Sequence, residues 1–214
     1  PAEPAPTETP AGLTVDPLPP PTEKELVTLK NGEVEYTLTN IGGGIDFAEF
    51  QHEFAVGTKD HSPENRVKVN RHGTGPIGAI AGVGESIENI AYAYKAEESI
   101  DGKKAVYIAK LSSGLIVKKT FTLIESNEAG APYLLDFDLQ LENSAATALN
   151  LNQWSIFLGE AAPLYQAEVP DQTGFFWRED GSINFTSGTS FQGGMFGAAK
   201  SIINSPDTDK IEFA

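Results

Sequence analysis

An alternating segment that runs into three consecutive glycines constrains the fold of this chain more than any other feature. In residues 34–38, apolar residues occupy every second position and polar residues lie between them, which is the period of a strand with one buried and one wet face. Residues 42–44 are all glycine, and a new alternation begins at Ile45. Because glycine reaches positive φ without steric cost, the three glycines predict a tight corner or bulge between two strands.

The two-residue period continues through most of the chain after residue 26. Residues 104–111 and 115–123 are both strand-like and flank a Ser-Ser-Gly turn that ends at Gly114, so they predict a hairpin. The clearest alternation covers residues 133–142, where leucine and phenylalanine occupy one face and acidic or amide residues occupy the other. The other strands that the pattern predicts are residues 149–158, 173–178 and 182–186.

Helical periodicity is weak throughout the chain. No stretch longer than about ten residues follows a 3.6-residue repeat, and only residues 85–90 and 196–203 are candidates for short helices. Many strands joined by polar turns are typical of an antiparallel sandwich. We therefore predict an all-β fold, a large antiparallel β-sandwich with few short helices.

Proline dominates the first part of the chain. Eight of the fourteen prolines precede Glu25, and three of them are consecutive at residues 19–21. This composition favours extended polyproline II over a packed core, so we expect residues 1–25 to be a flexible tether and residues 26–214 to be one folded domain. The chain opens at a proline, and no apolar run reaches the ~20 residues of a membrane span. We therefore expect a piece of a longer protein whose anchor lies upstream.

Charge and cysteine content exclude several classes of function. A formal net charge of −15 and a pI near 4.5 are the opposite of the basic stripe that nucleic acid requires, and they disfavour an anionic membrane surface as well. The chain has no cysteine, which excludes disulfides, thiolate metal sites and cysteine nucleophiles. Strong acidity also favours solubility, and we expect a monomer in isolation.

Two glycine motifs resemble nucleotide sites only in their spacing. Gly73, Gly75 and Gly78 match a dinucleotide-binding loop, but the residues before them are too polar for a buried strand and those after them are too rich in glycine for a helix. Residues 194–201 approach a Walker A pattern, with alanine where the glycine before the lysine belongs. We expect no cofactor. Residues 59–85 are predicted to form a long loop over one sheet, the first place to look for a ligand.

Candidate catalytic and metal-binding residues are scattered. The three histidines, His52, His61 and His72, are spaced irregularly, whereas metal ligands usually have fixed spacing on rigid elements. Asp136 and Asp138 share a strand face, but a solvated surface explains them better than a cation does. The same holds for the second such pair in the chain, Asp207 and Asp209. No Gly-x-Ser-x-Gly motif occurs. We predict no catalytic residue and no metal site.

Aromatic residues late in the chain could bind a sugar or a peptide. Trp154 alternates in phase with Ile156 and Leu158, which predicts a core position. Phe176 and Trp177 are adjacent, so in a strand they point to opposite faces. This leaves open that one of the two is exposed.

Two segments carry a resemblance to a known family. The first is Leu29-Lys-Asn-Gly-Glu-Val-Glu-Tyr-Thr-Leu-Thr-Asn-Ile-Gly-Gly-Gly-Ile45, which follows the proline-rich tether, and the second is Ser190-Phe-Gln-Gly-Gly-Met-Phe-Gly197. Together they resemble the large periplasmic domain of a YidC-type membrane protein insertase, over residues 26–214. The residues that carry the resemblance are Asn40, Gly42, Gly43, Gly44, Gly193, Gly194, Phe196 and Gly197.

The resemblance implies a β-supersandwich, similar to sugar mutarotases, between two membrane helices at the periplasmic face of the bacterial inner membrane. In that family the insertase activity belongs to the membrane helices. This domain would therefore be auxiliary and not an enzyme. It would offer a docking surface to Sec-translocon accessory proteins or nascent membrane proteins, and it would meet the membrane only through flanking helices outside the chain.

A carbohydrate-binding or mutarotase-like sandwich is the alternative, because the implied fold is shared with sugar enzymes and a fold does not decide function. Such an enzyme needs a histidine and a carboxylate that converge in an open cleft for proton transfer. His52 and His72 facing one cleft with a glutamate would favour the enzyme. Histidines scattered on loops would favour the interaction domain.

Overall fold

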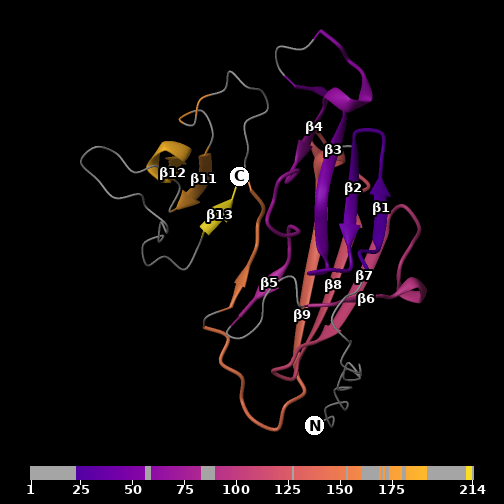
Figure 1. The fold of residues 1–214 in the computed structure, drawn as a ribbon, viewed down its shortest axis with the longest axis vertical. Helices are drawn as coiled ribbons and strands as arrows, with labels where there is room; N and C mark the ends of the chain where they lie inside the picture. The colour runs from indigo at the N-terminus through magenta and orange to yellow at the C-terminus, as the bar shows by residue number, and fades with distance from the viewer. Residues whose placement is uncertain are drawn as a thin grey trace, which may run out of the picture.

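The chain folds into antiparallel sheets, as the alternating sequence predicts (Figure 1). The structure is a computed structural model, and it describes residues 23–55, 59–82, 90–126, 128–152, 154–160, 169, 171, 174–179, 182–191 and 211–213. Helices that these residues form are 3-10 helices of three or four residues. The all-β prediction is therefore confirmed.

The described residues form strands and short 3-10 helices in the following order. The strands are β1 (Leu26–Lys30), β2 (Val34–Thr39), β3 (Gly44–Phe54), β4 (Arg66–Val69), β5 (Ile80–Ala81), β6 (Ala93–Tyr94), β7 (Lys104–Lys110), β8 (Leu115–Leu123), β9 (Leu135–Asn143), β10 (Ser155–Ile156), β11 (Gly174–Glu179), β12 (Ser182–Ser187) and β13 (Ile211–Phe213). The 3-10 helices are η1 (Pro63–Asn65), η3 (Ala96–Glu98), η4 (Ala131–Tyr133) and η6 (Gly188–Phe191).

Two four-stranded sheets form the sandwich. The first has the order β1-β2-β3-β4 and the second has the order β6-β7-β8-β9. The chain around β5 extends the first sheet, because Ile45 and Ile77 exchange two backbone hydrogen bonds of 2.9 and 2.8 Å. Phe157, just after β10, bonds in turn to residues 78 and 79. The short ribbon β5-β10 therefore continues the first sheet past β3, and a third sheet of order β12-β11-β13 lies beside the sandwich (Figure 1).

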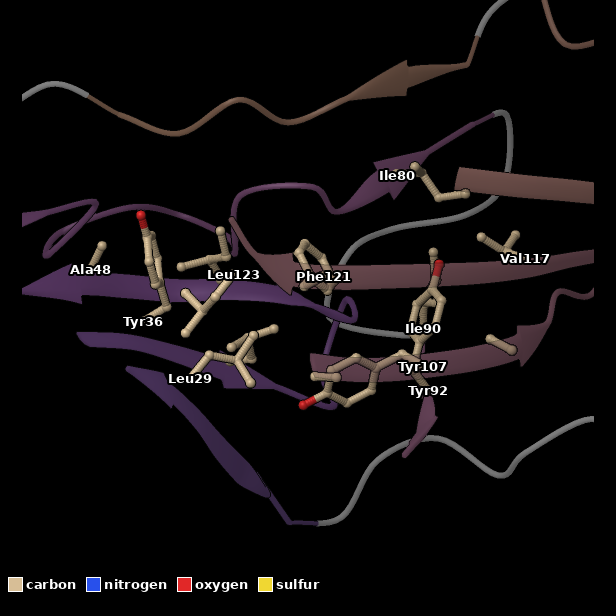
Figure 2. Close-up of a cluster of buried hydrophobic side chains, with 14 of the residues drawn as sticks. Leu29, Tyr36, Ala48, Ile80, Ile90, Tyr92, Tyr107, Val117, Phe121 and Leu123 are labelled. Carbon is tan, nitrogen blue, oxygen red and sulfur yellow. The ribbon is translucent and has the colours of Figure 1, made fainter. Parts of the chain in front are cut away.

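The core lies between the inner faces of the two sheets. The alternating apolar residues of β2 and β8 point inward and are fully buried, as Leu38 and Val117 illustrate. Tyr107 and Phe121 meet in the middle of the second sheet, with their ring centroids 6.5 Å apart in an edge-to-face arrangement (Figure 2). Aromatic pairs of this geometry contribute about 0.5–1.5 kcal/mol beyond the area that they bury.

Most of the predicted strands are confirmed. The hairpin of β7 and β8 closes on Gly114, whose φ is +87°. β9 starts two residues later than predicted, because η4 occupies residues 131–133. β11 and β12 pair as a hairpin. The candidate helices at residues 85–90 and 196–203 lie outside the described residues, apart from Ile90, which is in neither a helix nor a strand.

Two predictions about secondary structure are wrong. Residues 59–85 are not one long loop, because β4 pairs with β3 and β5 pairs with β10. Among the described residues of the predicted segment 149–158, only Ser155 and Ile156 form a strand. In both regions the pairing is short and joins residues far apart in sequence, so the local pattern that signals a strand is weak.

Candidate functional site

The three consecutive glycines form the corner between β2 and β3, where backbone conformation favours glycine at Gly42 and Gly43 and close packing requires it at Gly43 and Gly44. Gly42 and Gly43 have φ values of +73° and +55°. A Cβ on Gly43 would lie 2.5 Å from Cγ of Tyr92, and a Cβ on Gly44 would lie 2.3 Å from the carbonyl oxygen of Ile77. The predicted tight corner is thus confirmed, and close approach of other segments explains its glycines.

Asn40 is the other described residue among those that carry the predicted resemblance, and it binds the first residues of the folded chain. Its side-chain oxygen accepts a hydrogen bond of 2.9 Å from the backbone N–H of Glu25, and its amide nitrogen donates one of 3.2 Å to the carbonyl of Glu23. Its backbone N–H donates to Glu25 and its carbonyl accepts from Tyr92. The backbone and side-chain hydrogen bonds of Asn40 therefore join residues 23–25 to the sandwich.

A buried lysine closes the corner from the opposite sheet. Lys119 on β8 is 0% exposed, and its Nζ donates hydrogen bonds of 2.7 and 3.1 Å to the carbonyl oxygens of Gly42 and Gly43. The same nitrogen lies 4.3 Å from the ring centroid of Tyr92. Burial lowers the pKa of Lys119 well below its ordinary value. A neutral amine still has two N–H groups for the two carbonyls, so both bonds survive the loss of the proton.

Sequence reasoning missed Lys119, although the signal is present. The odd positions of β8 are Leu115, Val117, Lys119, Phe121 and Leu123, so one lysine stands in an otherwise apolar inward row. A charged residue in such a row needs a buried partner, and the glycine carbonyls supply it. Because Lys119 is sealed from solvent, its amine cannot reach a substrate and it ties the two sheets together.

The sandwich is open along the side where β9 and β10 lie. We use the term lateral opening for the surface formed by Phe137, Leu139, Leu141, Leu151, Trp154 and Ile156. It contains a cavity of about 200 Å³ between β8 and β9 on one side and β5 and β10 on the other. Phe137, Leu141 and Ile156 are 37%, 45% and 43% exposed. Exposed apolar side chains that border a concave surface are typical of a site for a partner.

Trp154 lies at the inner wall of the lateral opening. It is partly buried and packs against the core, so the predicted core position is confirmed, with the addition that its ring also lines the cavity. A Cβ on Gly82 would come within 2.3 Å of this ring, so the glycine lets the indole pack flat against the chain. Phe176 and Trp177 lie on β11.

The three histidines lie apart from the lateral opening. His52 is exposed on β3 and His72 is exposed in the turn after β4. His61 stacks on Phe54 with ring centroids 4.6 Å apart. Among the described residues, no group of three or more histidine or carboxylate side chains could hold a metal ion. Asp136 and Asp138 are exposed on the outer face of β9, in agreement with the predicted solvated face.

The glycine loop at residues 73–78 is held by Asn70 and lies between two strands. Asn70 has a φ of +62°. Its side-chain nitrogen donates to the carbonyls of Asp46 and Gly75, and its side-chain oxygen accepts from the N–H of Glu160. The loop leads into β5 and not into a helix, so it lacks the helix N-terminus that a dinucleotide site needs.

A second, wider hollow is polar, but its polar groups already have partners. It has a volume of about 470 Å³ and is lined in part by Asn31, Glu33 and Glu125. Asn31 caps the turn before β2 and donates to Pro132, Glu33 accepts a hydrogen bond from Tyr133, and Glu125 pairs with a lysine. Each of these three side chains therefore already has at least one hydrogen-bond or ion-pair partner within the chain.

Several predicted site residues fall outside the described part of the chain. These are Gly193, Gly194, Phe196, Gly197, Asp207, Asp209 and the Walker-like segment 194–201. Of the residues that carry the predicted resemblance, the structure thus brings together Asn40 and residues 42–44, around Tyr92 and Lys119.

Comparison with family models, curated proteins and solved structures found no match for this chain. Within the described residues, no helix has the length and apolar character needed to cross a bilayer. What the geometry offers chemically is an apolar concave surface beside a sheet edge.

Proposed function

We propose that this chain is the non-catalytic periplasmic domain of a YidC-type membrane protein insertase, and that the lateral opening is its docking surface. The partners are Sec-translocon components or nascent membrane proteins, and the site of action is the periplasmic face of the inner membrane. The proposal starts from the resemblance of residues 29–45 and 190–197 to that family. It belongs to the class of interaction domains, in which an apolar surface serves recognition and not chemistry.

The observation that carries the proposal is the exposed apolar surface of the lateral opening. Leu141 and Ile156 leave nearly half of their surface in water, and the cavity between their strands is lined almost entirely by apolar side chains. Burial of apolar surface contributes roughly 25 cal/mol per Å², so a partner that covers this surface gains free energy without any charged contact.

Site-specific cross-linking in membranes tests the proposal. The chain has no cysteine, so Leu141→Cys places a single reactive thiol at the lateral opening of the full-length protein. Asp101→Cys places one in an exposed turn on the opposite side of the molecule. The next residue, Gly102, forms an isolated β-bridge with Leu29 of β1. We expect the Leu141→Cys protein to form adducts with a Sec-translocon subunit or with a nascent membrane protein, and the Asp101→Cys protein to form none.

Two results would contradict the docking proposal. Equal adducts at both positions would mean that the thiols report collisions and not docking. Capture of neither kind of partner at Leu141 would remove the lateral opening as the docking surface. Binding of the isolated domain to a glycan array, in the absence of Sec capture, would favour the carbohydrate-binding sandwich instead.

A further inference from the structure

β9 forms one edge of the second sheet. The order of that sheet is β6-β7-β8-β9, and among the described residues β8 is the one strand that pairs with β9. The strand is nine residues long and contains no proline and no lysine. Natural edge strands are usually short or carry such residues, because a row of free N–H and C=O groups can pair with another chain.

The hydrogen bonds of the neighbouring strands show which backbone groups of β9 do not bond to β8. Leu111 N donates to Leu115 O over 2.8 Å, and Ser144 N donates to Gly114 O over 3.0 Å. Hydrogen-bonded pairs alternate along an antiparallel ladder, and the β7-β8 and β8-β9 registers are unbroken. The even residues of β9 therefore bond to β8. The N–H and C=O groups of Leu135, Phe137, Leu139 and Leu141 point away from β8, toward the free edge.

The two side-chain faces of β9 differ sharply. Leu135, Phe137, Leu139 and Leu141 face the inside of the sandwich, as their partners on β8 do, and Leu139 and Leu141 line the cavity of the lateral opening. The outer face carries Asp136, Asp138, Gln140 and Glu142. A strand added at this edge would continue both faces, because side chains directly opposite in neighbouring strands lie on the same side of the sheet.

The two aspartates of the outer face, Asp136 and Asp138, form no ion pair with a basic residue within the described part of the chain. Asp136 and Asp138 lie opposite Thr122 and Thr120 of β8, and Lys118 is paired with Glu98. Asp138 accepts a hydrogen bond from Gln140, its neighbour on the same strand face. An added strand with basic residues opposite the two aspartates would therefore supply a missing opposite charge, which stabilises a cross-strand pair.

Charge disfavours a second copy of the chain at this edge. If two β9 strands paired antiparallel about Leu139, Asp136 of each copy would lie opposite Glu142 of the other. Like charges directly opposite each other are destabilising, and each copy has a net charge of −15. The outer face thus disfavours self-pairing and favours a strand of opposite charge.

We propose that the free edge of β9 adds one strand of a partner protein, an extended segment in which apolar residues alternate with lysine or arginine. Its backbone bonds to residues 135–141, its apolar side chains enter the lateral opening, and its basic side chains lie opposite Asp136 and Asp138. The inference rests on the proposed function only in using the same face of the molecule. It adds the chemistry of the partner and the mode of binding, which is strand addition.

Hydrogen exchange on the whole chain tests the mode of binding. The probe is a nine-residue peptide that alternates lysine with valine or leucine, without any Sec component. We expect the amides of Phe137, Leu139 and Leu141 to exchange rapidly in the free protein and at least about tenfold more slowly with saturating peptide, because strand addition gives them acceptors. The same peptide methylated at the backbone nitrogens that face β9 loses its N–H donors to the carbonyls of β9, and the methyl groups clash with the strand edge, so this peptide should not bind and should not protect these amides.

Charge preference is tested with a matched pair of variants. A peptide with glutamate in place of each lysine should bind roughly tenfold more weakly to the wild-type protein. Asp138→Lys should reduce that preference roughly fivefold, whereas Asp101→Lys makes the same charge change in a distant exposed turn and should leave it unchanged. Both positions are exposed, and unchanged thermal unfolding of each variant shows that it is folded.

Four outcomes would overturn the proposal. Slow exchange at residues 137–141 in the free protein would mean that the chain covers its own edge, and concentration-dependent protection would mean that a second copy does. Equal binding of both peptides, or an equal effect of the two variants, would mean that the edge does not select charge. None of these measurements involves a Sec component. The strand-addition proposal can therefore be contradicted while the cross-linking result still supports the docking proposal, and the docking proposal can be contradicted while strand addition is supported.

Discussion

Replacing Gly43 with alanine is expected to destabilise the protein through two separate costs. The residue has a φ of +55°, a conformation that costs a residue with a Cβ roughly 1–2 kcal/mol. The new Cβ would also lie 2.5, 2.7 and 2.8 Å from three ring atoms of Tyr92. Tyr92 is buried, so its ring cannot move aside without displacing other core residues.

The two costs give the expected magnitude. Overpacking of a close-packed core costs about 1–3 kcal/mol, so the sum for Gly43→Ala is about 2–5 kcal/mol, a large part of the ~5–15 kcal/mol that stabilises an ordinary domain. Two other glycines separate the costs. Gly102 has a φ of +67° and no atom within 4 Å of the point where a Cβ would lie, whereas Gly32 has neither constraint. Gly102→Ala should cost about 1 kcal/mol, and Gly32→Ala should lie within about 1 kcal/mol of the wild type.

Urea denaturation of the four proteins at 25 °C, with a common slope m, measures these differences as shifts of the midpoint. The expected order of stability is Gly32→Ala, then Gly102→Ala, then Gly43→Ala. If Gly43→Ala costs no more than Gly102→Ala, the contact with Tyr92 has no energetic weight. The explanation of the glycine corner by close packing would then be wrong.

Three further substitutions probe other parts of the sandwich. Because burial lowers the pKa of Lys119, the unfolded chain binds more protons at this residue than the folded chain does. The stability of the wild type relative to Lys119→Met should therefore rise with pH up to about 10.5, by at most about 1.4 kcal/mol per pH unit. A stability difference between the two proteins that is independent of pH in urea melts would contradict this. Asn40→Ala removes two hydrogen bonds to residues 23 and 25 and should cost about 1–2 kcal/mol, with faster amide exchange at Glu25; unchanged exchange there would contradict it. Burial raises the pKa of Glu49, but hydrogen bonds from Lys68 and Arg66 outweigh burial and hold that pKa below its usual value. The greater stability of the wild type over Glu49→Gln should therefore be present at neutral pH and disappear as the pH falls through the folded-state pKa. Thermal melts between pH 3 and pH 7, a range set by the ordinary carboxylate pKa, would show a constant stability difference if the pairing had no effect.

Strands with one buried face could be predicted from the sequence, because alternation records burial directly. β2, β8 and β9 follow this rule, whereas β7 is a continuous apolar run that is buried on both faces, and the observed bounds of all four differ from the predicted ones by at most two residues. The short turns between them carry their own local signal, as Gly114 does with its positive φ. These elements depend on contacts between segments that are neighbours in sequence.

The strands that the sequence did not predict depend on distant partners. β5 consists of two residues and pairs with β10, more than 70 residues later in the chain. The bonds between Ile45 and Ile77 likewise join segments that no local pattern connects. β4 alternates basic residues with valine over only four residues, which is too short a pattern to mark a strand, and its strand conformation depends on pairing with β3.

The same distinction applies to the candidate site. Lys119 could have been found from the sequence, because it interrupts an apolar row, but its acceptors lie 76 and 77 residues earlier in the chain. The lateral opening could not have been found, because it exists only where β9 and the ribbon β5-β10 face each other. The alternation of β9 predicts a strand with an apolar face and does not tell whether that face is covered. Its exposure arises from the position of β9 at the end of a sheet, and that position, together with two aspartates on the outer face, is what makes the edge a candidate for a basic partner strand.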